Sequence, residues 1–498
     1  MALSPDQAVS FVALNRFGLG AKPGTDIASL TADPRGFLKQ ELDQKSEIIN
    51  APGLLDTKSG LQALFEHQRV EKMMREQMPA SKGQSVASMA ATPQPTVAAP
   101  QNGMQAGNRQ SANAMSDKDM TAKDMKPAQI PQDANLNESM ARFLQAYAAT
   151  TGFAERLVWF WSNHFCVSTS KGQEIEMTAG SFEREAIRPH ILGNFGTMLK
   201  AVEQHPAMLY FLDNQQSIGP NSKAGQRRGK GLNENLAREI MELHTLGVGS
   251  GYTQANVTSL ARIITGWTFA GQNNKDAEPG TFYFNANFHE PGDQKLLGKV
   301  YPQDGIAQGE AALDDLVINP ATAKHIAFKL ARHFVSDVPP PALVQRLTQT
   351  FLKTAGDLKE VTRALIDSDE AWAAPPTKLK TPQEFLMSGL RAIDFAPDDP
   401  KPLLNALNNM GEPLWRPSGP NGFGDTSDVW GSPQGIKVRL EVASVFAHKS
   451  KSQANPNDLV AQIIGPVASA ETRQAVSRAE SKPQALALLL MSPEFQHR

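Results

Sequence analysis

The chain contains very little cysteine. Cys166 is the only one among 498 residues. A single thiol excludes an intrachain disulfide, a zinc site built from several thiolates and an iron–sulfur cluster held by thiolates. It leaves the cellular compartment open, because one free thiol is tolerated in both oxidising and reducing surroundings.

An excess of charge and long apolar runs are also missing. The chain has 49 Lys and Arg residues and 51 Asp and Glu residues, so its formal net charge is -2 and the global positive footprint of a nucleic-acid binder is absent. The longest apolar runs, such as 485–491, fall short of the roughly 18–20 residues that cross a bilayer. The first residues have neither the charged start nor the apolar core of a secretory signal. We therefore predict a cytoplasmic protein with no transmembrane segment and no nucleic-acid partner.

The signatures of several common enzyme classes are absent as well. The sequence has no H-E-x-x-H zinc motif, no G-x-S-x-G nucleophile motif, no phosphate loop ending in Gly-Lys-Ser or Gly-Lys-Thr, and no G-x-G-x-x-G after a strand. Any chemistry must therefore come from polar residues that lie within apolar helices, where an uncompensated polar group costs several kcal/mol.

Residues 78–131 are almost without Leu, Ile, Val and aromatic side chains. Such a segment cannot offset its ordering entropy by burial, so we predict a low-complexity disordered insertion there. It would separate an N-terminal helical part, 1–77, from the main helical domain, 132–498. Met115, Met120 and Met125 could in principle hold a soft metal such as Cu(I), but low-complexity drift is the favoured explanation of these methionines.

Helical periodicity dominates the remainder. Val257, Leu260, Ala261 and Ile264 recur at the 3-4 spacing of a half-buried helix. Pro206 is a favoured helix start and Thr253 a favoured N-cap, while Gly247 is a favoured helix end. We predict a mainly α protein with one large multi-helix core. The exception is a small β-hairpin near 281–301, where a phenylalanine-rich strand precedes Pro291-Gly292 and a second strand follows.

Two helical segments carry the polar residues of interest. In 155–165, His164 lies on the same stripe as Leu157, Phe160 and Trp161, and Asn163 lies next to it. One interpretation is a hydrogen-bonded core histidine, and the other is a base or ligand facing a polar pocket.

In 233–244, a helix would place Asn235, Glu239 and Glu242 on one face, and Arg238 could pair with Glu234 and Glu242. A solvated face would make this a weak charge ladder. A buried face would make it an acid–base or cation site. His244 is expected to be a core histidine near the helix end.

Loops supply the other candidates. The basic segment 222–231 reaches a helix start, which is a favourable place for an anion, although such loops are usually only solvated. Asp213 and Asn214 end an apolar helix and could face a pocket or form a plain turn. His289, with the neighbouring Glu290 and Asp293, could complete a metal or acid–base group, or it could be an exposed loop residue without a functional role. The Pro- and Gly-rich segment 413–422, with Trp415 and Arg416, could form a wall or lid.

Seven motifs occur in a fixed order along the chain: Leu14–Gly20, Trp161–Phe165, Leu212–Asn214, Asn233–Glu242 with Leu246-Gly247, Thr265–Trp267, Phe288-His289 and Leu414–Pro417. In this order they resemble the bacterial domain-of-unknown-function 1800 family. The resemblance covers nearly the whole chain except for roughly 78–131.

The resemblance implies no established reaction. It does imply a possible partner, because genes of this family often lie beside members of the domain-of-unknown-function 1501 family, which resemble exported sulfatases or phosphatases. Co-export with such a signal-bearing partner would place the protein in the periplasm instead of the cytoplasm.

Two hypotheses follow. In the first, the protein is an enzyme with hydrolytic or metal-assisted chemistry, the cofactor being unknown and a divalent metal possible. In the second, it is a non-catalytic accessory protein in which the same charges form a buried structural network. Under the first hypothesis the expected catalytic residues are His164, Arg238, Glu239 and Glu242, the expected substrate-binding residues are Asn163, Asp213, Asn214, Asn235, Trp267, Trp415 and Arg416, and the expected metal ligands are His164, Glu239 and His289.

Overall fold

The computed structural model describes residues 5–43, 49–77, 130–228, 231–373, 376–450, 454–465 and 467–498. The predicted insertion, with its methionines, lies outside these residues apart from its last two positions, where a helix begins. The chain divides into two units: Met1–Phe65 with Ile130–Arg498, and Glu66–Gln129. All sites discussed below lie in the first unit.

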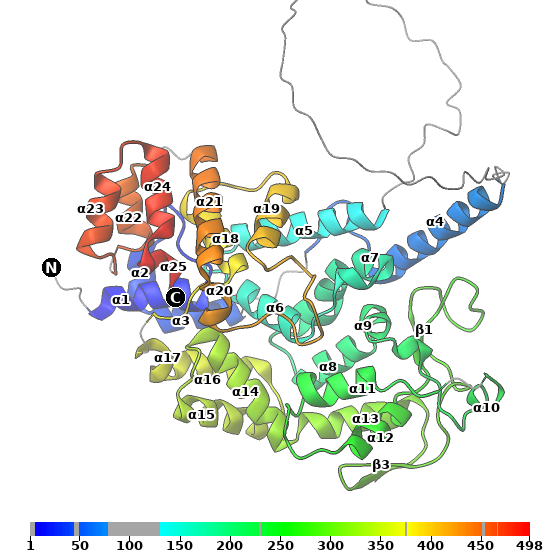
Figure 1. Ribbon diagram of the computed structural model, residues 1–498. Helices are drawn as coiled ribbons and strands as arrows, with labels where there is room; N and C mark the ends of the chain where they lie inside the picture. The colour runs from blue at the N-terminus through cyan, green and yellow to red at the C-terminus, as the bar shows by residue number, and fades with distance from the viewer. Residues whose placement is uncertain are drawn as a thin grey trace, which may run out of the picture. The chain divides into compact units, whose positions relative to one another are not determined.

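The first half of the chain is helical, as predicted (Figure 1). Short π-helical segments follow three of these helices, at Ala13–Phe17, Glu183–Ile187 and Ile240–His244. The α-helices are α1 (Pro5–Val12), α2 (Ile27–Ala32), α3 (Pro34–Asp43), α4 (Thr57–Gln77), α5 (Ile130–Ala148), α6 (Phe153–His164), α7 (Gln173–Phe182), α8 (Phe195–Glu203), α9 (Pro206–Phe211), α10 (Gly225–Arg228), α11 (Asn235–Glu239) and α12 (Gln254–Ile263).

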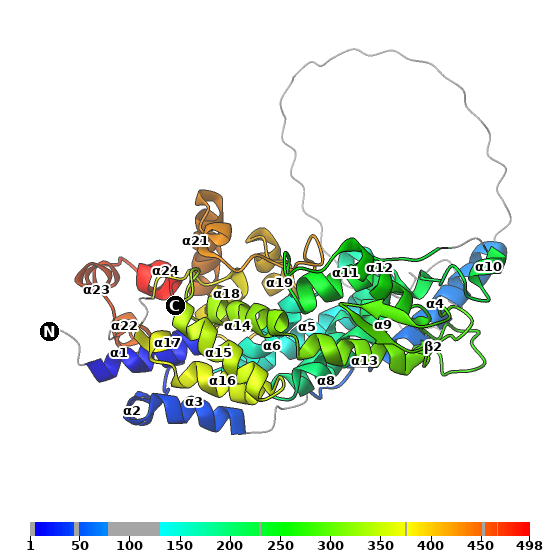
Figure 2. The same cartoon turned by 90° about the horizontal axis from the view of Figure 1, so that it is seen from below.

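The second half is also helical, and α14, α15 and α16 run beside one another in both views (Figures 1 and 2). The helices are α13 (Ile306–Val317), α14 (Pro320–Phe334), α15 (Pro341–Lys353), α16 (Leu358–Asp367), α17 (Asp369–Ala373), α18 (Pro382–Ala392), α19 (Pro400–Asn409), α20 (Ser427–Trp430), α21 (Pro433–Lys449), α22 (Pro456–Ile463), α23 (Ala470–Ser477), α24 (Lys482–Met491) and α25 (Pro493–Gln496). Among the described residues, no helix has the length and apolar character needed to span a membrane.

The β element is small, as predicted, but its pairing differs from the predicted hairpin. β1 (Trp267–Phe269) pairs antiparallel with β2 (Phe282–Phe284), and β3 (Gln294–Leu296) pairs with β4 (Lys299–Tyr301). The phenylalanine-rich strand therefore finds its partner upstream of itself. The reason lies in Leu297 and Gly298, which both have positive φ and close a two-residue turn, so that β3 and β4 form a hairpin of their own.

One main hydrophobic core runs through the first unit, which confirms the single-core prediction. The predicted helix boundaries also hold. Pro206 begins α9, Thr253 caps α12 with a reciprocal capping box to Asn256, and Gly247 adopts the left-handed conformation just after the π-helical segment.

Trp267, an expected substrate-binding residue, is a core residue in the structure. Its side chain is fully buried on β1, and its ring packs edge-on against Phe282. Gly309 on α13 lies so close that a Cβ there would come within 2.4 Å of the indole ring. The absence of a side chain at Gly309 therefore allows α13 to pack against this strand.

We expect Gly309→Ala to lower the free energy of unfolding by about 1–3 kcal/mol, because the new methyl group overlaps the Trp267 ring and the strain outweighs the gain in helix propensity. Gly389→Ala in α18 is the matched control. A Cβ there meets only Leu490 methyl groups at 3.8 and 4.0 Å, so this variant should gain up to about 1 kcal/mol. Urea unfolding of both variants checks this, and equal shifts would contradict it.

Candidate functional site

Helix α6 passes through the core and carries two charged residues and a histidine into it. Glu155, Arg156 and His164 are all buried, together with nearly all of its apolar side chains. The helix begins after Gly152, whose left-handed conformation starts the turn. The Glu41 carboxylate accepts hydrogen bonds from the Ala154 N–H and the Thr151 hydroxyl at this end, where a helix favours negative charge.

Each charge on α6 has a partner of opposite sign. Arg188 donates two hydrogen bonds to Glu155, at 2.6 and 2.8 Å. Arg156 pairs with Glu384 at 2.8 Å and also donates to the carbonyl oxygens of Arg16 and Gly18. The backbone of the first motif, around Arg16, therefore supplies hydrogen-bond acceptors for the Arg156 guanidinium.

Glu384, at the start of α18, joins three segments that are far apart in the chain. Its carboxylate contacts Arg156, and it accepts a hydrogen bond of 2.7 Å from Arg498. A second bond, from the Thr381 N–H, completes the capping box of α18. Burial alone would raise the pKa of Glu384, but Arg156 and Arg498 outweigh it and lower the pKa to about 2.

The end of α6 and the residues just after it fasten the loop 413–427. The Asn163 amide donates to the Phe423 carbonyl at 2.9 Å and accepts from the Phe423 N–H at 2.8 Å. The Cys166 thiol donates to the Pro420 carbonyl, and burial raises the pKa of this thiol to about 12, so it stays protonated. Asn163, expected to bind substrate, thus holds a loop, and the loop forms a cavity wall as the sequence suggested.

Two cavities adjoin this loop, and both are lined by Asn163, His333, Phe423, Gly424 and Asp425. We name them the Trp415 cavity and the Lys329 cavity after one lining residue of each. The Trp415 cavity has a volume of about 50 Å³, and the Lys329 cavity about 190 Å³.

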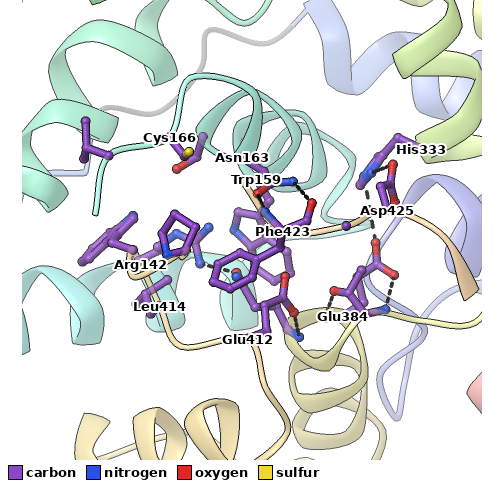
Figure 3. Close-up of a pocket in the computed structure, with 17 residues that line it drawn as sticks. Arg142, Trp159, Asn163, Cys166, His333, Glu384, Glu412, Leu414, Phe423 and Asp425 are labelled. Atoms are coloured by element: carbon purple, nitrogen blue, oxygen red, sulfur yellow. Dashed lines mark hydrogen bonds and ion pairs between the residues drawn. The ribbon is translucent and has the colours of Figure 1, made fainter. Parts of the chain in front are cut away.

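The Trp415 cavity has aromatic and acidic walls (Figure 3). Arg142 lies over the rings of Trp159 and Trp415, and both Arg142 and the Trp415 indole N–H bind the Glu183 carboxylate. Glu412 accepts a hydrogen bond of 2.8 Å from the Gln383 N–H, and burial raises its pKa to about 8. Trp415, an expected substrate-binding residue, therefore lines a cavity, whereas its neighbour Arg416 is exposed.

The Lys329 cavity contains His164, and the contacts of this histidine define its tautomer. Its Nε2 lies 3.2 Å from the His244 carbonyl oxygen, which can only accept, so Nε2 carries the proton. Its Nδ1 is then an acceptor and receives a hydrogen bond of 2.8 Å from the Lys329 ammonium. Burial, reinforced by Lys329, lowers the pKa of His164 well below its usual value, so the ring is neutral.

Lys329, on α14, was not among the residues expected from the sequence. Burial lowers its pKa to about 8, and the nearby Asp425 offsets only part of this effect. Arg332 and His333 follow on the same helix and line the same cavity. A lysine whose pKa lies this close to neutral can both release and accept a proton at physiological pH.

Two further histidines, His244 and His325, lie next to His164. The rings of His244 and His325 have their centroids 6.1 and 6.2 Å from that of His164. His244 is buried, as predicted, and its Nδ1 binds Glu203 at 2.7 Å, while His325 Nε2 donates to the Leu243 carbonyl. These hydrogen bonds hold the π-helical segment Ile240–His244 against His164.

The predicted carboxylate face of the 233–244 helix is a half-exposed charge ladder. Arg238 pairs with Glu234 at 3.3 Å and with Glu242 at 3.4 Å, as its spacing predicted. Glu239 is partly buried, which raises its pKa, and Asn235 is exposed. The change from α-helix to π-helix at Ile240 breaks the predicted stacking of these residues. None of them lines either cavity.

The remaining expected residues have structural contacts. Asp213 binds Lys171 at 2.6 Å, and the Asn214 amide donates to the carbonyl oxygens of Ile264 and Trp267. His289 Nδ1 donates to the Thr265 carbonyl. The neighbouring Glu290 accepts two hydrogen bonds from Asn221, so the basic loop 222–231 begins against a buried carboxylate.

The expected metal ligands His164, Glu239 and His289 do not form a group. Among the described residues, no three His, Cys, Asp or Glu side chains are placed to hold a metal ion. The physical reason is that His164 and His289 are each bound to separate carbonyl groups, on different elements. We therefore derive no metal-assisted step from this structure.

The sequence contained a signal for the residues that were missed. His325, Lys329 and Arg332 recur at spacings of four and three on α14 and so share one face, while Ile326, Leu330 and Phe334 lie in the core. Glu384 and Asp425 had no such local signal, because their partners lie on other helices.

We expect Glu384→Gln to lower the free energy of unfolding by about 3–5 kcal/mol, because it leaves Arg156 and Arg498 buried without a counter-charge. Glu242→Gln, on the half-exposed ladder, is the control and should cost less than about 1 kcal/mol. Urea unfolding at pH 7 gives both values. Similar small losses in the two variants would show that the buried network contributes little to stability.

Glu412 should make stability depend on pH. Because its pKa rises from 4.5 to about 8 on folding, its contribution is fully present below pH 4.5 and is lost as the pH rises through 8. Glu412→Gln stays neutral, so between pH 5 and pH 8 it should lose less stability than the wild type, by on the order of a few kcal/mol. Urea unfolding at the two pH values measures this difference, and parallel losses would refute the raised pKa.

The chain was compared with known families, curated proteins and solved structures. No curated protein and no solved structure matches it. A family model with the description "Protein of unknown function (DUF1800)" matches residues 12–497. This match confirms the resemblance found in the seven motifs, and the chain belongs to the DUF1800 family.

Proposed function

We propose that the protein is an enzyme that performs acid–base chemistry, of a hydrolytic kind, on a small molecule in the Lys329 cavity. The observation that carries the proposal is the 2.8 Å hydrogen bond from Lys329 Nζ to His164 Nδ1, together with the bond from His164 Nε2 to the His244 carbonyl. The second bond orients the imidazole, so its free lone pair points at the lysine.

This pair can move a proton near neutral pH. The Lys329 ammonium is the acid, and the amine left after it gives up a proton is the base. His164 stays neutral, and its Nδ1 accepts a hydrogen bond from the ammonium and so positions Lys329 Nζ at the cavity. The side chain of Asn421 and the glycine at 424 are exposed and line the same cavity, so a substrate can approach from the loop side.

The size of the Lys329 cavity limits the substrate. A volume of about 190 Å³ is below the roughly 300–1,000 Å³ of pockets for drug-sized ligands. The cavity suits a small metabolite or the terminal group of a larger molecule. Arg238, Glu239 and Glu242 have no role in this proposal, because they lie outside the cavity.

We expect the Lys329 amine to titrate with an apparent pKa of about 8. Competitive acetylation across pH 6–11, read by peptide mass spectrometry, measures this value, with the exposed Lys324 on the same helix as internal reference.

In a screen of small carboxylate and phosphate esters, Lys329→Met and His164→Gln should lower kcat/KM by at least about 100-fold.

Lys324→Met is the matched control for the screen and should leave kcat/KM unchanged. Activity that survives in both Lys329→Met and His164→Gln would remove this pair from the mechanism. A wild type that turns over none of the esters would argue against the proposed hydrolysis and favour the accessory role.

A further inference from the structure

Lys329 and Arg332 lie one helical turn apart on α14 and line the same cavity. Within the part of the chain that the structure describes, the one hydrogen-bond partner of Lys329 is the neutral His164. The Arg332 guanidinium lies 4.4 Å from the centre of the Phe328 ring, and its buried Nε has no hydrogen-bond partner. Among the ion pairs of the described residues, none includes either cation.

Most other arginines of the described core bind carboxylate or carbonyl oxygens. Arg142, Arg156, Arg188 and Arg498 each bind a carboxylate, although one nitrogen of Arg156 and one of Arg498 have no hydrogen-bond partner. Arg391 donates to the carbonyl oxygens at the end of α5 and to Gly20. Lys329 and Arg332 differ from these arginines because neither forms an ion pair among the described residues although both line a cavity, where two like charges repel each other.

Asp425, the acidic group that lines the Lys329 cavity, balances only part of the positive charge there. Its Oδ2 accepts a hydrogen bond of 3.1 Å from His333. Its Oδ1 has no hydrogen-bond partner and lies 3.4 Å from the Lys378 ammonium. His333 is neutral at pH 7, because burial lowers its pKa to about 4. One carboxylate therefore serves three cations, Lys329, Arg332 and Lys378, and positive charge is left over in the cavity.

We propose that Arg332 anchors an oxyanion of the substrate, a carboxylate or a phosphate, and so places the rest of the substrate beside Lys329. This inference rests on the proposed function, because it names the substrate class of the same site. A guanidinium presents paired N–H donors that match the oxygens of either group, and its stacking on Phe328 pre-orients it. Lys329 adds a second positive charge next to the bound oxyanion.

The test uses inorganic phosphate and acetate as probes on the full-length protein, with isothermal titration calorimetry and thermal unfolding. We expect one of the two probes to bind and to raise the Tm of the wild type. In Arg332→Gln the Kd should rise at least about tenfold. Arg332→Lys keeps the positive charge but loses the paired N–H donors of the guanidinium, so its Kd should lie between those of Arg332→Gln and the wild type.

Arg262→Gln is the matched control, because Arg262 is also partly buried with an unpartnered Nε but lies outside both cavities. It should bind the probe as the wild type does. Binding of phosphate alone or of acetate alone identifies the oxyanion. The inference is overturned if the wild type binds neither probe, or if both Arg332 variants bind with the wild-type Kd.

The failure of this inference is separable from failure of the proposed function. The Lys329 amine can titrate near pH 8 in a protein that binds no oxyanion, in which case only the substrate class is wrong. Conversely, phosphate binding that depends on Arg332, in a protein whose Lys329 variants keep full esterase activity, would preserve the anion site and refute the proton-transfer pair.

Discussion

The structure depends on the neutralisation of a carboxylate in the core. Glu384 lies where α6, α14 and α18 meet, and Arg156 and Arg498 hold it ionised despite its burial. Taking these charges out of water costs several kcal/mol each, and only close pairing offsets that cost. The positions of α6, α18 and the C-terminal residue are therefore coupled, because a shift of any one of them would leave a buried charge without its partner.

This coupling also positions the cavities. Arg156 contacts both Glu384 and His333, and His333 in turn binds Asp425 in the loop 413–427. The same loop is fastened to α6 by Asn163. These contacts therefore link the buried charges to the wall of the Lys329 cavity, in which α14 places Lys329 and Arg332. The charges of the network pair with one another, whereas Lys329 and Arg332 form no ion pair among the described residues.

The sequence predicted local features well and the site only in part. The spacing of Arg238 predicted its two ion pairs, and the capping residue Thr253 predicted the start of α12. His164 was identified as a polar residue on an apolar stripe, and it lines a cavity. Its partner Lys329 lies 165 positions away in the chain, and no local pattern relates two residues across that distance. Glu239 and His289, which were expected to bind a metal together with His164, do not line the Lys329 cavity.

The sequence by itself determined the mainly helical class, the helix boundaries and the family, because these follow from periodicity, caps and ordered motifs within short stretches. Tertiary structure alone decided which polar residues meet. The spacing that places charges on one face of a helix is the same for a solvated face and a buried one, and only packing distinguished the paired ladder at Arg238 from the cavity-lining cations Lys329 and Arg332. Burial and the supply of partners, both properties of the assembled core, turned similar side chains into a surface network and a candidate site.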